Sequence, residues 1–396
     1  MLYNSNKKKL EYHNIKKYVF DLAFDRSATS TGETKTVKYI QRELDKSNII
    51  TKIEYFYWTN IIRISMKTMY LVLISYLLFY RLYLLIVAFF FFKYLFQKTR
   101  DISFTKKERS KNLIARLKAK KRKKNRPVII LSAHYDSISS RIPYKTQKIL
   151  LFLARVIILP YIALSIFISI SLTLNILLIT SFNNIIFYLI SICSLISLVF
   201  GVPIFLFLFT STRSTGSIDN ASGVSILIEL AKNFKVNPLN NYDLIFVFCG
   251  SEEWGLKGSK NYVKRNYVKL NRKYNLNESF NINLDMVGSY IGLLNKTGIF
   301  KKKNLNRNLN ERLLESSQKL NIPIELYDKI IKPKSDYHSF QKLKKLTKSN
   351  FEVACFHSDR DSIYIHSRDD TPDKCYEEIL GGCYEIIDDC ILVIDS

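Results

Sequence analysis

The sequence predicts an α/β protein with a mostly parallel, mixed sheet, helices on both faces of that sheet, and transmembrane helical hairpins inserted into the chain. Three observations support this fold class. Short apolar runs alternate with helical stretches, charged and histidine side chains directly follow several of these runs, and two long apolar blocks interrupt the pattern. The 396 residues are enough for a large domain with a sizeable core.

Helical periodicity marks several stretches outside the apolar blocks. The first is Gly32–Asn48, for which Ser30 or Thr31 can serve as the N-cap. The others are Gly223–Phe234 and a last stretch near Lys374–Ile394. The expected strands are Thr51–Trp58, Pro127–Ala133, Asp243–Cys249, Asn281–Val287 and Phe351–His357. Because strands that alternate with helices favour parallel pairing, we expect one sheet that is covered on both faces.

The two apolar blocks are long enough to enter a bilayer. The first, Thr68–Phe92, carries Arg81 near its middle, and an arginine at the centre of a spanning helix costs about 2.5–3.5 kcal/mol on insertion scales. The second, Ile149–Thr212, suits two helices near Ile157–Thr180 and Ile185–Phe209. Each block interrupts one folded domain, so each must cross the membrane an even number of times.

These blocks divide the chain into one domain and two insertions. We predict a single domain built from 1–60, 101–146 and 213–396. The first membrane insertion, 61–100, is a hairpin or a re-entrant pair, and the second, 147–212, is a two-helix hairpin. Basic residues flank the domain ends of both blocks. The positive-inside rule therefore predicts an integral, multi-pass membrane protein with its folded domain on the cytoplasmic side.

The chain is strongly basic, with 60 Lys and Arg against 34 Asp and Glu and a net charge of +26. Such an excess favours an anionic partner or surface. Part of it lies in Lys118–Arg126, KAKKRKKNR, which is either a solvated loop or a patch that binds anionic lipid beside the bilayer. Nucleic-acid binding would rest on charge alone, and we do not expect it. The six cysteines lack paired spacing, so no disulfide framework is expected.

Histidine and acidic side chains follow the ends of the predicted strands. His134 and Asp136 come directly after PVIILSA, Glu252 and Glu253 follow DLIFVFC, and Asp285 ends NINLD. In an open α/β sheet, functional groups gather just beyond the carboxyl ends of the strands. We therefore expect these side chains to converge on one edge of the sheet.

Two further candidates complete this set. Asp219 opens DNASG just ahead of a helix, and His366 lies in IHSRDDTPD after the last strand. Without a metal ion, such a cluster of like charges would repel and would be costly to desolvate. A mixed set of nitrogen and oxygen donors suits zinc. One carboxylate bridging two ions, with a histidine and an acid for each, leaves one glutamate to act as general base toward a shared water.

Five motifs in this order, AHYDS, DNASG, SEEWGLKGS, NLDMVG and IHSRDDTPD, resemble those of the co-catalytic di-zinc aminopeptidase family. That family includes bacterial leucine aminopeptidases, and its relatives include glutamate carboxypeptidase and the transferrin receptor. Each motif alone is weak, whereas five in order are a specific signal. The likeness covers about residues 20–60, 105–140 and 213–395 and leaves out both apolar blocks.

The resemblance implies a zinc-peptidase fold and two zinc ions. The implied ligands are His134, Asp219, Glu253, Asp285 and His366. His134 and Asp285 would bind one zinc, Glu253 and His366 the other, and Asp219 would bridge the two.

The resemblance also implies roles for residues that bind no metal. Glu252 would be the general base, and Asp136 would orient His134 from behind. Asp370 would either play the matching part for His366 or cap a helix, and His357 is an alternative ligand in place of His366.

One loop departs from the family pattern. In SDYHSF, Tyr337 stands where the family usually has a histidine directly after the aspartate, and His338 follows. The family's substrate-binding detail is therefore not carried over to this loop.

The predicted function is that of a membrane-embedded, zinc-dependent exopeptidase, an aminopeptidase acting on a peptide or protein substrate. The alternatives are a non-catalytic membrane scaffold and a glutaminyl cyclase-like acyltransferase, which shares the fold. The motifs leave open side-chain preference, amino- versus carboxypeptidase action and oligomeric state.

Overall fold

The structure, a computed structural model, describes residues 2–58, 108–121, 123–140, 214–298, 302–330 and 333–396, and a few isolated residues between 146 and 192. Its contacts group the chain into two compact units. The first consists of Met1–Trp58, Arg109–Ser139 and Thr212–Ser396, and the second of Thr59–Glu108 and Ser140–Ser211. The predicted insertions, 61–100 and 147–212, lie almost wholly outside the described residues. The predicted domain boundaries therefore stay a prediction.

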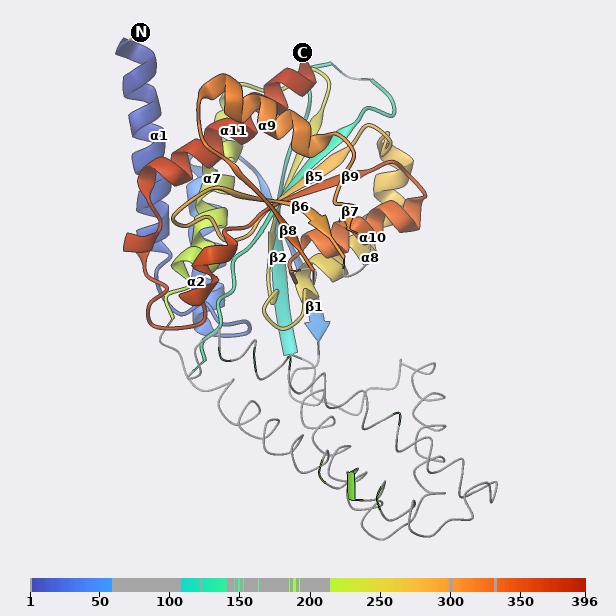
Figure 1. Cartoon of the computed structure of the whole chain (residues 1–396). Coiled ribbons are helices and arrows are strands. Elements are labelled where there is room, and N and C mark those ends of the chain that lie inside the picture. Colours follow the sequence, from blue (N-terminus) through green and yellow to red (C-terminus); the bar gives the residue numbers. More distant parts are fainter. Residues whose placement is uncertain are drawn as a thin grey trace. The chain divides into compact units, whose positions relative to one another are not determined.

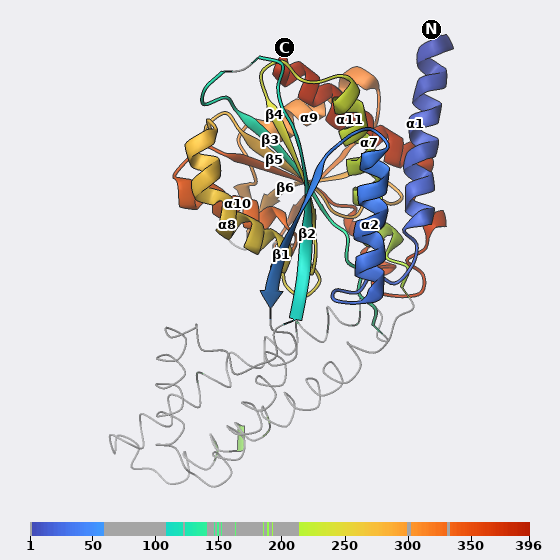
Figure 2. The ribbon, with the colours of Figure 1, turned by 180° about the vertical axis from the view of Figure 1, so that it is seen from behind.

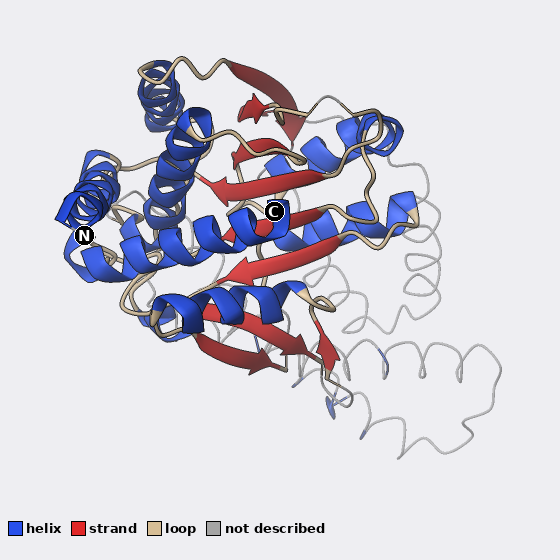
Figure 3. Ribbon diagram, turned by 90° about the horizontal axis from the view of Figure 1, so that it is seen from above, coloured by secondary structure: helices blue, strands red, loops and turns tan. Residues whose placement is uncertain are grey.

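The described residues form one nine-stranded sheet with the order β1-β2-β4-β3-β5-β9-β6-β7, and β8 pairs with β6 (Figure 1). The strands are β1 (Thr51–Trp58), β2 (Glu108–Leu117), β3 (Val128–His134), β4 (Asp243–Cys249), β5 (Phe280–Leu284), β6 (Gly292–Thr297), β7 (Lys303–Asn304), β8 (Glu325–Lys329) and β9 (Glu352–Phe356). Strands β4, β3, β5 and β9 are parallel neighbours, whereas β2 pairs with β4, and β6 with β9, in the antiparallel sense. The sheet is mixed with a parallel centre, and its strands fan out in a twist (Figure 3).

Helices cover both faces of this sheet. They are α1 (Leu2–Asp21), α2 (Thr31–Asp45), α7 (Ser222–Val236), α8 (Lys257–Lys273), α9 (Leu309–Leu320), α10 (Tyr337–Thr347) and α11 (Glu377–Asp395), with the short helical turns η1 (Ser217–Ala221), η2 (Asp359–Ile363) and η3 (Pro372–Lys374). Helices α1, α2, α7 and α11 lie on one side, and α8 and α10 on the other (Figures 1 and 2). Every residue of β3, β4 and β5 is buried, as expected for central strands packed on both faces.

Local sequence signals explain where α2 begins. Ser30 is the N-cap, and its hydroxyl accepts the N–H of Glu33 at 3.1 Å. The Glu33 carboxylate reaches back and accepts the N–H of Thr29 at 2.8 Å. Reciprocal bonds of this kind satisfy amides that have no partner inside the helix.

One predicted strand is shorter than its apolar pattern. The sequence predicts a strand to Val287, whereas β5 ends at Leu284. Beyond that point Met286 donates its N–H to the side chain of Asn220 at 3.2 Å, and Val287 donates to Ser222 at 3.0 Å. Because these amides bond to side chains and not to a neighbouring strand, the chain leaves the sheet just where Asp285 stands.

The prediction of transmembrane helical hairpins is corrected. Within the ranges that the structure describes, no helix is both long and apolar enough to cross a bilayer. A spanning helix needs about 20 predominantly apolar residues. Helix α1 has 20 residues but includes the run KKKLEYHNIKK, and α11 has 19 residues but includes acidic residues along its length. Within the described residues, the fold class is thus a mixed α/β sheet without membrane insertions. The same finding contradicts the prediction of an integral, multi-pass protein with its domain on the cytoplasmic side.

A lipid bilayer as partner has no support from the described residues either. In the basic run Lys118–Arg126, the Arg126 guanidinium pairs with Asp243 at 2.7 Å and donates to the carbonyl oxygen of Lys121 at 3.1 Å. Asp243 is the first residue of β4 and is buried. This arginine therefore stabilises the start of a central strand.

Candidate metal centre

The candidate ligands lie where three neighbouring parallel strands end. His134 is the last residue of β3, Glu253 follows β4, and Asp285 directly follows β5. Asp219 belongs to the irregular turn η1 ahead of α7, and His366 lies between η2 and η3 with a positive φ of 59°. The sheet and two loops from distant parts of the chain thus bring these side chains together.

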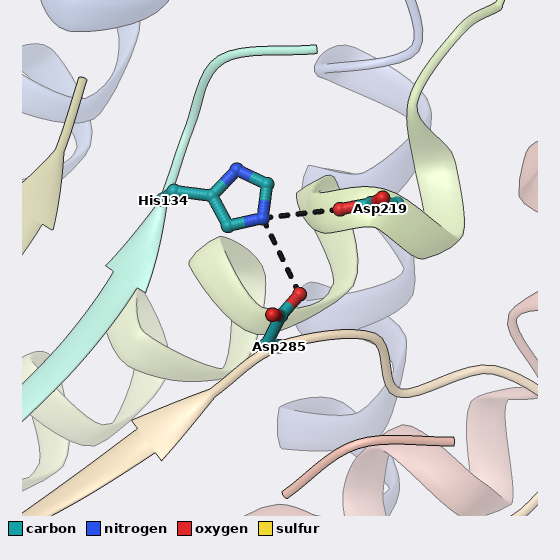
Figure 4. Close-up of side chains that lie close together, drawn as sticks. All are labelled: His134, Asp219 and Asp285. Carbon is teal, nitrogen blue, oxygen red and sulfur yellow. Dashed lines mark hydrogen bonds and ion pairs between the residues drawn. The ribbon is translucent and has the colours of Figure 1, made fainter. Parts of the chain in front are cut away.

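The first cluster centres on His134. Its Nε2 atom lies 3.0 Å from Asp219 Oδ1 and 3.3 Å from Asp285 Oδ1 (Figure 4). All three side chains are buried. On the far side of the ring, Nδ1 lies 3.1 Å from the backbone carbonyl oxygen of Asp136 and can donate to it. This contact favours the tautomer that leaves Nε2 without a proton and able to bind a metal.

The second cluster centres on His366. Its Nε2 atom lies 3.3 Å from Asp219 Oδ2 and 3.1 Å from Glu253 Oε1. Asp219 therefore belongs to both clusters, with one carboxylate oxygen toward each imidazole. A carboxylate placed in this way can bridge two cations.

Zinc fits these donors. Ligand atoms about 2.0–2.2 Å from a tetrahedral zinc lie about 3.3–3.6 Å from one another. The contacts between an imidazole nitrogen and a carboxylate oxygen in the clusters, at 3.0 to 3.3 Å, are at or just below this spacing. Imidazole nitrogen and carboxylate oxygen are donors that zinc accepts. Glu253 Oε1 is buried and lies 3.1 Å from His366 Nε2 without a hydrogen bond of good geometry, so a cation held between the two atoms would bind this oxygen. The predicted zinc site is supported, whereas the number of ions stays a prediction.

The protonation of the isolated side chains points the same way. Burial alone would raise the pKa of Asp219, but the imidazoles of His134 and His366 outweigh it and hold the pKa below its ordinary value. Burial alone would lower the pKa of His366, but the carboxylates of Glu253 and Asp219 raise it to about 10. Metal binding therefore replaces protons on the imidazoles, because a histidine ligand must be neutral.

Glu252 lies beside the clusters but belongs to neither. It is buried, and burial raises the pKa of its carboxyl well above the ordinary range, with a further increase from the charge of Glu253. A carboxyl group of raised pKa next to a metal centre is suited to accept and return a proton. The predicted roles, Glu253 as a metal ligand and Glu252 as the general base, are compatible with this environment and stay predictions.

Asp136 makes different contacts from those that the sequence suggests. Its carboxylate Oδ1 is 3.7 Å from His134 Nδ1, beyond hydrogen-bond distance, and the backbone carbonyl of Asp136 lies closer to that nitrogen. The carboxylate instead accepts the N–H of Glu252 at 2.9 Å and that of Glu253 at 3.2 Å. Asp136 thus holds the turn that carries both glutamates.

Asp370 also acts on a neighbouring backbone. The sequence suggests either a partner for His366 or a helix cap, but Asp370 Oδ1 accepts the N–H of Ile218 at 2.6 Å. The cap position of η3 belongs to Thr371. Because Ile218 directly precedes Asp219, this buried carboxylate stabilises the turn that presents the bridging residue.

Asn220 is a functional residue that sequence reasoning missed. Its side chain donates to the Leu284 carbonyl at 2.9 Å and accepts the N–H groups of Gly223 and Met286 at 3.1 and 3.2 Å. It therefore links the Asp219 turn to the strand end that carries Asp285. The DN pair before a helix is a visible capping signal, but the link to β5 is a tertiary contact and leaves no local pattern.

The remaining candidates lie outside the clusters. His357 is buried beside Tyr327, with ring centroids 6.2 Å apart, and is in neither metal group. Tyr337 is buried, and its hydroxyl donates to the carbonyl of Pro333 at 3.0 Å. His338 Nε2 lies 2.8 Å from the same carbonyl. The rings of Tyr337 and His338 in the SDYHSF loop therefore both contact the backbone of the preceding residues.

Comparison with known families identifies the carboxy-terminal part of the chain. Residues 202–390 match peptidase family M28. The predicted resemblance to the co-catalytic zinc aminopeptidases is confirmed at this level.

A curated relative of the chain is aminopeptidase YwaD of Bacillus subtilis (strain 168). The two are 40% identical over 76 residues, which is 19% of the chain and 16% of the relative. The match therefore covers a small part of that protein.

Solved structures share the fold over nearly the whole chain. The aminopeptidase from Aneurinibacillus sp. strain AM-1 aligns with a TM-score of 0.57 at 16% identity, covering 96% of this chain and 93% of that one. BSAP, a zinc aminopeptidase from Bacillus subtilis, aligns with a TM-score of 0.55 at 14% identity, covering 96% and 94%. A glutaminyl cyclase from Fimbriiglobus ruber aligns with a TM-score of 0.56 at 13% identity, covering 96% and 95%. Since peptidases and cyclases share this fold, its activity must be argued from the site.

Proposed function

We propose that this chain is a zinc-dependent exopeptidase, an aminopeptidase that holds two zinc ions and hydrolyses a peptide bond. The observation that carries the proposal is the position of Asp219, whose two carboxylate oxygens face two different imidazoles. A structural acid needs only one charged partner. Two imidazoles on one buried carboxylate, each with a further acid beside it, are expected of a two-ion centre.

Each residue of the proposed centre has a part that follows from its contacts. His134 and Asp285 hold one ion, His366 and Glu253 the other, and Asp219 holds both. When bound, zinc polarises a carbonyl group and makes water more acidic.

Glu252 accepts the proton of the attacking water and returns it to the nitrogen of the leaving amine. The water oxygen joins the carbonyl carbon as the carbon–nitrogen bond breaks, so the products are a carboxylic acid and an amine. Asp136 keeps Glu252 in place by accepting its backbone N–H.

A glutaminyl cyclase-like acyltransferase is the main alternative, because cyclases share the fold. The second cluster favours the peptidase. A centre with one ion has no need of a second imidazole, whereas His366 lies on Asp219 and Glu253 together. Non-catalytic members of such a fold have no need of this donor set either.

The proposal is tested with the purified full-length chain, aminoacyl chromogenic amides and a peptide that begins with glutamine. We expect amide hydrolysis that stops on removal of metal with a chelator and returns with zinc. Glu252→Gln keeps the shape of the side chain but removes its basicity, and its kcat is expected to fall by about 10²–10⁴-fold. Zinc content, measured on the same samples, should stay unchanged because Glu252 is outside both clusters.

The matched control is Glu311→Gln, which makes the same chemical change on the exposed face of α9 and should leave activity unaltered. Hydrolysis that survives both chelation and Glu252→Gln would eliminate the mechanism. Cyclisation of the glutamine peptide without amide hydrolysis would select the acyltransferase. Absence of bound zinc after reconstitution would select a non-catalytic protein.

A further inference from the structure

Arg26 is a fully buried cation behind the proposed metal centre. It is 0% exposed and lies in the short segment between α1 and α2. Its backbone N–H donates to Ser137 Oγ at 3.0 Å. Burying a guanidinium is costly unless its donors are satisfied, so its partners identify what the arginine does.

The guanidinium of Arg26 donates to backbone carbonyls on three segments of the chain. Nε donates to the Tyr135 carbonyl at 2.8 Å. Nη1 donates to the Thr215 carbonyl at 2.7 Å, and Nη2 to the Gly216 carbonyl at 2.7 Å. Nη1 also reaches the carbonyls of Leu22 and, at 3.2 Å, Phe24 on its own segment.

These partners flank the proposed metal ligands. Tyr135 stands between His134 and Asp136, and Thr215 and Gly216 lead into the η1 turn that carries Asp219. The planar fork of one arginine therefore joins the end of β3 to the loop that presents the bridging carboxylate. The contact of 3.0 Å between His134 Nε2 and Asp219 Oδ1 depends on the relative position of these two segments.

Gly216 permits this close approach. A Cβ atom at this position would lie 2.7 Å from Arg26 Nη2 and 2.6 Å from Ser137 Cβ. The residue also has a φ of +59°, which side chains disfavour. Gly216 and Arg26 are thus packed tightly against each other.

The charge of Arg26 suits its surroundings. Burial lowers its pKa to about 10, while Asp370, Asp136 and Asp219 oppose that decrease, so the guanidinium remains protonated at neutral pH. It supplies a permanent positive charge next to the acids of the proposed centre.

We propose that Arg26 is a positioning residue of the metal centre, which sets the spacing between His134 and Asp219 through the carbonyls of Tyr135, Thr215 and Gly216. The inference rests on the proposed function, since it concerns the same ligands. It adds a residue from the amino-terminal segment, which precedes both the ligands and the part of the chain matched to the family.

The test compares Arg26→Gln and Arg26→Lys with the unmodified full-length chain. Zinc affinity is measured by competition with a chromophoric chelator, and the cobalt-substituted protein gives an absorption spectrum that reports ligand geometry. Loss of a residue that orients metal ligands typically lowers metal affinity about 10–100-fold. We expect such a loss in both variants, because lysine keeps the charge but cannot reproduce the planar fork.

Asp395→Asn is the structural control. Asp395 accepts the N–H groups of Asn240, Asn241 and Tyr242, which precede β4 at the edge of the sheet opposite the metal centre. This variant should lose stability toward unfolding by urea yet keep zinc affinity and the cobalt spectrum. The comparison separates a general loss of stability from a specific effect on the centre.

Three results would overturn the inference: unchanged zinc affinity in both Arg26 variants, full restoration by lysine, or an equal loss of affinity in Asp395→Asn. If Arg26→Gln does not fold, Arg26→Lys and Ser137→Ala decide, the latter removing only the hydroxyl that accepts the Arg26 N–H. Failure of the unmodified chain to bind zinc would instead reject the proposed function and this inference with it.

Discussion

The Asp136 carboxylate accepts the backbone N–H of Glu252 at 2.9 Å, and its other oxygen accepts that of Glu253 at 3.2 Å. Asp136 follows β3, and the two glutamates follow the adjacent strand β4. One buried acid therefore couples the strand end that carries His134 to the turn that carries the proposed base.

Asp136→Asn should impair activity without unfolding the protein. The amide replaces one acceptor oxygen with an NH₂ group, which would face the N–H of Glu252 or Glu253. We expect kcat/KM to fall about 10–100-fold, the usual cost of disturbing a residue that orients a metal centre. The control, Asp45→Asn at the exposed end of α2, should leave kcat/KM unchanged. Equal activity of the two variants would contradict the assigned contact.

Asp219→Asn and Asp285→Asn should differ in the number of metal ions that they lose. Asp219 contacts both imidazoles, whereas Asp285 contacts His134 alone. Zinc content per chain, measured by elemental analysis after dialysis, should fall by about one ion in Asp285→Asn and by about two in Asp219→Asn, because only Asp219 belongs to both donor sets. The same loss from both variants would argue against a bridging role for Asp219.

Removal of zinc should lower the melting temperature. Zinc binds the folded centre and not the unfolded chain, so free zinc at about 100 times its Kd adds about 2.7 kcal/mol to the free energy of unfolding. Scanning fluorimetry of chelated and reconstituted protein measures the effect. Magnesium prefers oxygen ligands in octahedral geometry and should not restore stability. Full recovery with magnesium would be inconsistent with the histidine-containing donor set.

Glu43→Gln should destabilise the protein in a pH-dependent way. Glu43 is buried and lies 2.6 Å from the Lys46 ammonium and 3.3 Å from that of Lys232. Burial alone would raise its pKa, but the two lysines outweigh burial and lower the pKa below the ordinary value of 4.5. A lowered folded-state pKa means that the stabilising contribution is present above pH 4.5 and is lost as the pH falls through the folded-state pKa.

At pH 7 the variant should therefore lose about 1.5–3 kcal/mol in the free energy of unfolding, the range for hydrogen bonds to charged groups. The loss should shrink toward pH 3.5. Urea unfolding of metal-free protein at both pH values measures it, with Glu311→Gln as an exposed control. A loss of the same size at pH 7 and pH 3.5 would refute the prediction.

Several elements were predictable because their signals are local. The strands Thr51–Trp58 and Asp243–Cys249 agree residue for residue with β1 and β4. Asp243–Cys249 is a largely apolar run that ends at Gly250 and Ser251, and Thr51–Trp58 is rich in β-branched and aromatic residues. Polar segments were harder to predict. Helix α8 reads KGSKNYVKRNYVKLNRK, in which only a few apolar residues are spread among many polar ones. Strand β8 reads ELYDK and is exposed over much of its length. Neither has a strong apolar pattern.

Apolar length, flanking basic residues and the parity of crossings led to the membrane predictions, and these are the clearest correction. Apolar length and flanking charge are local properties and do not report which surface a segment contacts. Within the described residues, the helices of sufficient length carry charges that a bilayer would exclude.

The sequence by itself determined which histidines and acids follow the ends of the strands, because strand patterns and motif order are written along the chain. Only the tertiary structure decided how those groups contact one another. Asp136 contacts the turn after an adjacent strand, and Asn220 connects the η1 turn to the end of β5. Arg26 bonds to Thr215, which lies 189 residues further along the chain. Such bonds form between groups that the fold brings together, and no periodicity or spacing in the chain encodes them.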